Sequence, residues 1–334
     1  MLRVAIINDT SPTHHYGCML VMENLIRLLG NQQVEIVWTW PVGIDWRKHK
    51  AKLSKLPVVD AFIVNGEGTI HHSADRKHAR ALAEFAGYAL NHLQTPSYLI
   101  NATLNQNTVE LYEKLQSFKL VYVRDKGSLK ELQDAGLCGR YVPDLTFAKA
   151  ETYQYIPSKA GCVIDTALKK EIPILKSYSA ENDFDFRSMV VARPSNVNFF
   201  RSPRPFVINI YKWLMGDRKV SLLPSSYIKY LAEHKIVITG RYHTVSMCLK
   251  NKIPFVAIES NTPKITFLLE DALKSSDRIV RFGDLTELNL EKYKLYSQSE
   301  LESLEIFISA AESSIEDMIK VVVKDIKNDA KRIN

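Results

Sequence analysis

The sequence predicts an α/β protein made of two Rossmann-like domains, and three observations lead to this prediction. In the first half, short runs that are apolar throughout alternate with helix-like segments. This pattern is typical of a parallel sheet whose two faces are covered by helices. The same alternation returns after about residue 205, and a loose polar stretch at 148–158 separates the two halves. A length of 334 residues is sufficient for two domains of ordinary size.

The expected N-terminal domain, residues 1–150, contains six strand-like runs separated by helices. The strands are expected at Arg3–Asn8, VEIVWTW (34–40), Val58–Gly66, SYLINA (97–102), Leu120–Asp125 and RYVPDLTF (140–147). Helices are expected at Met19–Leu29, Ala79–His92, Thr108–Leu115 and Lys126–Ala135. The strands are too apolar to have one face in water, so both faces of the sheet should be buried.

The expected C-terminal domain, residues 158–295, opens with AGCVID (160–165) as a strand. Residues 168–202 have no clear periodicity. Further strands are expected at KVSLLP (219–224), KIVITG (235–240), IPFVAIE (253–259) and RIVRF (278–282). Helices are expected at Pro205–Leu214, Ser225–Glu233, Tyr242–Leu249 and Lys264–Leu269.

A long helix is expected at residues 299–332, because apolar residues recur there at spacings of three and four. This stripe consists of Leu301, Leu304, Ile308, Ala311, Ile315, Met318, Val322 and Ile326. Ser299 and Glu302 have the spacing of a capping box. We expect the helix to pack across the two domains. The alternative is a peripheral membrane contact through its basic end, KDIKNDAKR.

Composition narrows the class of protein. The formal net charge is +7, from 44 basic and 37 acidic residues without a basic cluster, which disfavours nucleic acid as a partner. Anionic small substrates or an anionic membrane surface fit this charge. The four cysteines are far apart and form no CxxC pair, which favours reduced thiols in the cytoplasm. We see neither a signal-peptide pattern nor an apolar run of spanning length, and expect a cytoplasmic protein, with a peripheral contact at the inner face of the membrane left open.

The stretch ITGRYH (238–243) places Arg241 and His243 where a buried strand ends and a helix begins. Gly240 allows a sharp turn there. The free N–H groups of a helix N-terminus attract an anion, and Arg241 can bind a carboxylate or phosphate in bidentate fashion. His243 can exchange a proton near neutral pH. The alternative is that Arg241 pairs with a nearby carboxylate and His243 is an ordinary packed side chain.

Two carboxylates also follow predicted strands. Glu67 lies in NGEGT, between Gly66 and Gly68, which permit an unusual backbone and close approach of a ligand. Asp144 lies in PDLTF. Two carboxylates at one edge of a sheet can divide into acid and base, or nucleophile and acid. The alternative is that Glu67 is solvated and Asp144 caps the next turn.

Two histidine pairs, His14–His15 and His71–His72, lie in loops after strands. Adjacent histidines rarely reach one metal and no ligand spacing accompanies them, so we expect no metal and assign them to sugar or phosphate contacts. The sequence has no Walker A motif, no GxGxxG in its first turn and no GxSxG. This disfavours P-loop kinases, dinucleotide dehydrogenases and α/β-hydrolases.

These motifs together resemble the polysaccharide pyruvyl transferase family. The resemblance runs in order through HHYGCMLVMENL, NGEGT, VRDKGS (123–128, containing Arg124), PDLTF and GRYHTVSMCLKNKIPFVAIESNTPKITFLLED. Gly240, Arg241, His243, Pro254 and Lys264 stand at the positions of the family's signature. The resemblance implies two Rossmann-like domains facing a central cleft, as in GT-B glycosyltransferases. It further implies transfer of a pyruvyl unit from phosphoenolpyruvate to a sugar diol of a cell-surface glycan or lipid-linked glycan, without a cofactor. Arg241 and Lys264 would hold the donor, and His243 would be its acid or phosphate ligand.

The sequence departs from the family pattern at two positions. Cys18 follows Gly17 where the family has Asp, and Glu67 stands in a turn that is usually all Gly. This suggests a second hypothesis, a retaining glycosyltransferase that uses a CMP-activated acidic sugar such as Kdo, with Asp144 or Glu67 as nucleophile. A third hypothesis is an inactive carbohydrate-binding protein. The acidic-donor hypotheses share Arg241, and Arg124 with the histidine pairs would contact the acceptor.

Overall fold

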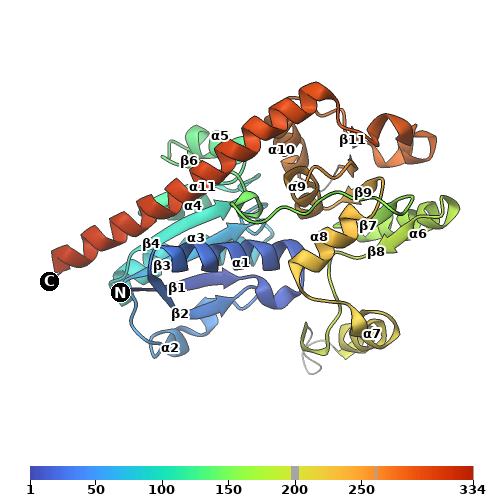
Figure 1. Cartoon of the computed structure of the whole chain (residues 1–334). Coiled ribbons are helices and arrows are strands. Elements are labelled where there is room, and N and C mark those ends of the chain that lie inside the picture. Colours follow the sequence, from blue (N-terminus) through green and yellow to red (C-terminus); the bar gives the residue numbers. More distant parts are fainter. Residues whose placement is uncertain (197–202, 260–261, 334) are drawn as a thin grey trace. The chain divides into compact units, whose positions relative to one another are not determined.

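The computed structural model describes residues 1–196, 203–259 and 262–333, and the chain divides into two compact units. Unit 1 comprises residues 1–10, 22–148 and 311–334, and unit 2 comprises residues 11–21 and 149–310. The predicted α/β class is confirmed, since each unit contains a parallel sheet with helices (Figure 1).

Unit 1 is built on a six-stranded sheet of order β2-β1-β3-β4-β5-β6, in which all pairings are parallel. The strands are β1 (Leu2–Asp9), β2 (Val34–Pro41), β3 (Ala61–Glu67), β4 (Ser97–Ala102), β5 (Leu120–Val123) and β6 (Arg140–Tyr141). The helices are the end of α1 (Tyr16–Asn31), α2 (Lys50–Leu53), α3 (Lys77–Leu93), α4 (Val109–Leu115) and α5 (Lys126–Asp134).

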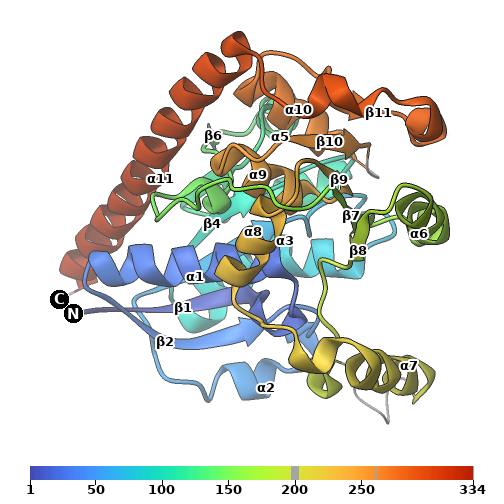
Figure 2. The ribbon, with the colours of Figure 1, turned by 45° about the vertical axis from the view of Figure 1, so that its right-hand side comes forward.

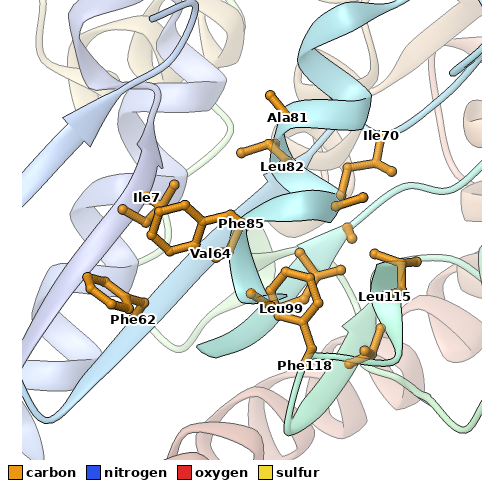
Figure 3. Close-up of a cluster of buried hydrophobic side chains, with 14 of the residues drawn as sticks. Ile7, Phe62, Val64, Ile70, Ala81, Leu82, Phe85, Leu99, Leu115 and Phe118 are labelled. Atoms are coloured by element: carbon orange, nitrogen blue, oxygen red, sulfur yellow. The ribbon is translucent and has the colours of Figure 1, made fainter. Parts of the chain in front are cut away.

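The core of unit 1 explains why its strands are continuous apolar runs. Every residue of β3 and β4 is buried. Figure 3 shows Leu82 and Phe85 of α3 over Val64 of β3 and Leu99 of β4. With helices on the sheet, neither side of these strands meets water, so no polar alternation is needed.

Unit 2 is built on a five-stranded parallel sheet of order β11-β10-β9-β7-β8. Its strands are β7 (Cys162–Thr166), β8 (Asp185–Arg187), β9 (Val237–Gly240), β10 (Phe255–Ile258) and β11 (Ile279–Val280). Its helices are α6 (Ile172–Glu181), α7 (Pro203–Met215), α8 (Pro224–Ala232), α9 (Tyr242–Lys250) and α10 (Lys264–Ala272), with the first residues of α1.

The start of α1 is held in unit 2 by backbone pairing. The amide of Tyr16 donates to the carbonyl of Met189 at 3.2 Å, and the amide of Val191 donates to the carbonyl of His14 at 3.0 Å. These two bonds attach residues 14–16 to the chain that follows β8, and so place His14 and His15 in unit 2.

The predicted strand at KVSLLP is wrong. No strand is assigned there, and Leu223 is 63% exposed. The carbonyl of Val220 accepts from Arg193 Nη2 at 2.5 Å, and that of Ser221 accepts from the Tyr16 hydroxyl at 2.5 Å. These carbonyls therefore accept hydrogen bonds from side chains and do not need the amides of a neighbouring strand.

The long C-terminal helix is confirmed as α11 (Gln298–Ile333). Most of its apolar stripe is buried, including Leu304 in unit 2 and Ile315, Val322 and Ile326 in unit 1. Because this stripe is used for packing, it is not available to a membrane. No helix among the described residues has the length and apolar character to cross a bilayer.

The capping box of α11 was predicted two residues too late. Its N-cap is Ser297, whose Oγ accepts from the amide of Glu300 at 3.2 Å. The Glu300 carboxylate accepts from the amide of Ser297 at 2.7 Å. Ser297–Glu300 and Ser299–Glu302 both have the spacing of a capping box. The first pair forms the cap because the Glu300 carboxylate is also held by Arg278, at 2.6 Å.

Candidate functional site

Four basic side chains gather in unit 2 where three helices begin. His15 immediately precedes α1, Arg241 immediately precedes α9 with His243 in its first turn, and Lys264 is the first residue of α10. The rings of His15 and His243 meet edge to face, with centroids 5.5 Å apart. Helix N-termini carry unpaired N–H groups and partial positive charge, so this cluster favours an anion.

Gly17 fixes the position of His243. A Cβ atom placed on Gly17 would lie 2.2 Å from the Cβ and Cγ atoms of His243. Only glycine allows the first turn of α1 to approach α9 this closely. Gly240 has a similar role beneath Arg241, since its Cβ atom would lie 2.7 Å from Thr166 Oγ1. The requirement at Gly240 is therefore close packing of β9 on β7.

Arg241 pairs with a nearby carboxylate in bidentate fashion, as the alternative interpretation of ITGRYH predicts. Its Nε and Nη2 atoms each lie 2.8 Å from an oxygen of Asp165, at the end of β7. Asp165 also accepts from the amide of Met189 at 3.1 Å and the hydroxyl of Ser188 at 2.7 Å. The pair fixes the guanidinium plane and uses its Nε–Nη2 edge. Asp165 was not predicted as a functional residue, although it ends the predicted strand AGCVID, just as Glu67 directly follows the predicted strand Val58–Gly66.

The pKa of His15 reflects its burial and the positive charge of the cluster. Burial, reinforced by the nearby His243, Arg241 and Lys264, holds the pKa of His15 well below its usual range. His15 is therefore neutral at physiological pH and can donate or accept a hydrogen bond without adding charge. Arg241 and Lys264 bring two positive charges to the cluster, which Asp165 offsets in part.

Cys18 completes a group that could bind a metal ion. Ligand atoms of His15, Cys18 and His243 all lie within 4.8 Å of one another, and His and Cys are the preferred ligands of zinc. His14 is not in this group. Arg241 and Lys264, which lower the pKa of His15, would also repel a dication. The electrostatics thus favour an anion over a metal here.

The carboxylates of unit 1 belong to a buried polar network at the carboxyl ends of β3 to β6. Asp144 accepts from Arg124 Nη1 at 2.7 Å, with side-chain exposures of 0% and 2%. Its other oxygen accepts from the amide of Thr146 at 2.9 Å, which caps a short 3₁₀ helix. Arg124 Nε donates to Thr103 Oγ1 at 2.7 Å, and the Thr103 amide donates to the Glu67 carbonyl at 2.8 Å. Both oxygens of Asp144 are thus engaged.

Glu67 has the unusual backbone that we had assigned to its neighbouring glycines. Its φ is +37°, whereas Gly66 and Gly68 are not in the left-handed region. Gly66 is required instead for close contact, because its Cβ atom would lie 2.5 Å from that of Ala102. The buried Glu67 carboxylate accepts from the Thr10 hydroxyl, and from Asn65 Nδ2 at 3.0 Å. Left-handed non-glycine residues concentrate at functional sites, which gives Glu67 added weight.

The second histidine pair lies in unit 1. His71 is buried and its Nδ1 atom lies 2.7 Å from Nδ1 of His72. Arg76 Nη1 contacts the His71 ring. This arrangement orients His71 through Arg76, whereas His14 and His15 are held by the backbone pairing in unit 2.

A family model described as polysaccharide pyruvyl transferase matches residues 15–262 of this chain. The match includes all the basic residues of the unit 2 cluster except Lys264, and both carboxylates of the unit 1 network. Among curated proteins, none matches the sequence.

Solved structures show the same fold at low sequence identity. The UDP-GlcNAc 2-epimerase of Methanocaldococcus jannaschii, in complex with UDP-GlcNAc and UDP, is 11% identical with a TM-score of 0.55, covering 97% of this chain and 100% of the epimerase. A putative UDP-N-acetylglucosamine 2-epimerase of Listeria monocytogenes is 10% identical with a TM-score of 0.51, covering 97% and 96%. These likenesses support the predicted GT-B-like fold class.

Proposed function

The chain belongs to the polysaccharide pyruvyl transferase family, and we propose that it forms a ketal on a sugar by transferring the pyruvyl unit of phosphoenolpyruvate. The acceptor is a glycan or lipid-linked glycan of surface polysaccharide assembly, and the reaction takes place in the cytoplasm. The observation that carries this proposal is the cluster of His15, Arg241, His243 and Lys264 at three helix N-termini in unit 2. Phosphoenolpyruvate bears both a phosphate and a carboxylate, which such a cluster can bind together.

Each residue of the cluster has a role in this proposal. Arg241, oriented by Asp165, binds the donor through its Nη1 side, and Lys264 binds a second anionic group. His243 gives a proton to the methylene carbon of phosphoenolpyruvate, which becomes a methyl group. One sugar hydroxyl then bonds to the central carbon, and a second hydroxyl displaces phosphate. The two hydroxyl protons are lost, one returning to His243 and one leaving with the phosphate.

The acceptor residues are assigned to unit 1. The Glu67 carboxylate can accept a hydrogen bond from a sugar hydroxyl and so orient it, and the histidines of His71–His72 can bind other hydroxyls. Asp144 is assigned to holding Arg124, since both of its oxygens already have partners.

One observation favours a second candidate, a retaining glycosyltransferase that uses a CMP-activated acidic sugar. Glu67 is a buried carboxylate on a left-handed backbone, as a positioned nucleophile would be. Glu67 suits this role better than Asp144, whose salt bridge to Arg124 would have to break. An acidic sugar would use the same Arg241.

Ligand-dependent thermal unfolding separates the two donors. A ligand at 100 times its Kd stabilises the folded state by about 2.7 kcal/mol. We expect phosphoenolpyruvate to raise the midpoint by several degrees, and CMP or UDP to leave it unchanged. UDP is included because the M. jannaschii epimerase was solved with it. If CMP raises the midpoint and phosphoenolpyruvate does not, the protein is the glycosyltransferase and not the pyruvyl transferase.

Variants of the ion pair test whether the cluster is the donor site. Arg241→Ala would leave Asp165 buried without its partner, so the paired variant Arg241→Gln/Asp165→Asn is preferable. It should fold and lose phosphoenolpyruvate binding and phosphate release by at least about 100-fold. Arg281→Gln, an exposed arginine of the same unit, is the control. An unaffected biological function in the paired variant would favour an inactive carbohydrate-binding protein.

A further inference from the structure

Helix α7 of unit 2 presents an apolar face to solvent. The helix has no buried residue. Five large apolar side chains at spacings of one, three and four are between 55% and 71% exposed: Val207, Ile208, Tyr211, Leu214 and Met215. With 100° between successive residues, these five fall within one third of the helix circumference. Scattered exposed apolar residues are common, but a continuous stripe of five needs an explanation.

The opposite side of α7 faces the protein, so the exposed stripe has a fixed orientation. Phe206, Asn209, Ile210 and Trp213 are only partly exposed. Asn209 Nδ2 donates to the carbonyl of Arg193, and the guanidinium of Arg218 lies 5.9 Å from the centre of the Trp213 ring. In both Figure 1 and Figure 2, α7 lies apart from the five-stranded sheet of unit 2.

Basic residues accompany the stripe. Arg204, Lys212, Arg218 and Lys219 are exposed, and Asp217 is the sole acidic residue in positions 203–219. Asp217 is engaged, since its carboxylate accepts from the amide of Ala192 at 2.6 Å. An apolar stripe with flanking cations is typical of a helix that lies in the interface of an anionic bilayer.

We propose that α7 docks unit 2 on an anionic membrane surface, with its apolar stripe inserted at the headgroup boundary and its cations on the lipid headgroups. The charge distribution favours lipid over a second copy of this chain. A two-fold interface through α7 would bring the same cations of both copies together, and like charges destabilise such an interface. This inference does not depend on which donor the protein uses.

Flotation of the full-length protein with lipid vesicles tests the proposal. One set of vesicles contains phosphatidylcholine with phosphatidylglycerol, and the other contains phosphatidylcholine alone. We expect binding to the anionic vesicles, weakening with added salt, and little binding to the neutral ones. Equal binding to both sets, or to neither, would overturn the proposal.

Two variants, each with a matched control, locate the contact. Ile208→Ser/Leu214→Ser removes part of the stripe, and Leu295→Ser/Ile306→Ser removes exposed apolar residues elsewhere in unit 2. The α7 variant should lower vesicle partitioning by at least about tenfold without changing the thermal midpoint, and the control should not. If partitioning is unchanged in the α7 variant, α7 is not the docking surface.

The charge variant is Lys212→Glu/Lys219→Glu, with Lys169→Glu/Lys170→Glu as its control. Each basic residue near an anionic surface contributes about fivefold in binding, so reversal of two should lower partitioning at least about tenfold. Sedimentation velocity tests the competing explanation, which is self-association of the protein through α7. A concentration-dependent dimer that Ile208→Ser/Leu214→Ser abolishes would assign the stripe to self-association and overturn the membrane proposal.

Discussion

Replacing Gly17 by alanine tests the arrangement of the candidate donor site more directly than removing any charged residue. The added methyl carbon would lie 2.2 Å from two carbon atoms of His243 and 2.4 Å from its Nδ1 atom. Carbon atoms in van der Waals contact are about 3.5 Å or more apart, so α1 and His243 must separate by about 1 Å. Overpacking of this size costs about 1–3 kcal/mol, and misplacement by about 1 Å can reduce catalysis about 100-fold.

Gly30 provides the matched control in the same helix. A Cβ atom on Gly30 meets nothing within 4 Å, so Gly30→Ala should be neutral or stabilise by up to about 1 kcal/mol. The thermal midpoint and the rate of phosphate release from phosphoenolpyruvate should therefore both fall in Gly17→Ala, and neither should fall in Gly30→Ala. Gly17→Ala with wild-type stability and wild-type donor binding would refute the close packing of Gly17 on His243, and with it the proposed site geometry.

Three further predictions follow from other contacts. The pKa of His15 in the folded state lies well below its ordinary value of 6.5, so between these two values the unfolded state binds more protons than the folded state. The free energy of unfolding should therefore fall as the pH is lowered through 6.5. Urea unfolding of His15→Gln between pH 7 and 5 should show a shallower fall, and identical slopes would contradict the shift. Ser297→Ala removes the hydroxyl that accepts from the Glu300 amide and should cost about 1 kcal/mol in thermal unfolding; no change would mean that the cap is dispensable. Phosphoenolpyruvate should protect Cys18 from alkylation, measured by mass spectrometry, while the exposed Cys138 reacts at an unchanged rate; equal protection of both would exclude a local effect.

The central strands β3, β4, β7, β9 and β10 could be predicted from the sequence because their burial is complete. The edge strands are less buried: β8 was not predicted, and β6 ends at Tyr141, well before the end of the strand predicted at 140–147. Where helices cover both faces, each strand is a continuous apolar run bounded by polar loops, as at SYLINA, and β4 has the predicted bounds. KVSLLP has the same local appearance but lies at the surface, where Tyr16 and Arg193 satisfy its carbonyls. Both partners are distant in sequence, so no local pattern could exclude a strand.

The candidate site was predictable in part for the same reason. Arg241 and His243 could be found because they follow a strand that is recognisable by itself. The approach of His15 and Cys18 to His243 could not be predicted, because it depends on backbone pairing of residues 14–16 with residues 189–191. That pairing lies in a region without periodicity. Gly17 was the one hint in the sequence, but its role becomes clear only when His243 is seen to pack where a Cβ atom of residue 17 would lie.

Electrostatics decide whether His15, Cys18 and His243 bind an anion or a metal ion. Two unit charges 4 Å apart interact by about 4 kcal/mol at an effective dielectric constant of 20. A zinc ion would bring two positive charges towards Arg241 and Lys264, with Asp165 as partial compensation, whereas phosphoenolpyruvate would bring compensating negative charge.

We therefore expect phosphoenolpyruvate-dependent stabilisation to survive dialysis against EDTA, and the purified protein to contain much less than one equivalent of zinc by plasma emission spectroscopy. Zinc at one equivalent that is lost in Cys18→Ser would refute this reasoning. In that case the cations near His15 would serve to lower the pKa of His15 and keep its imidazole available as a ligand.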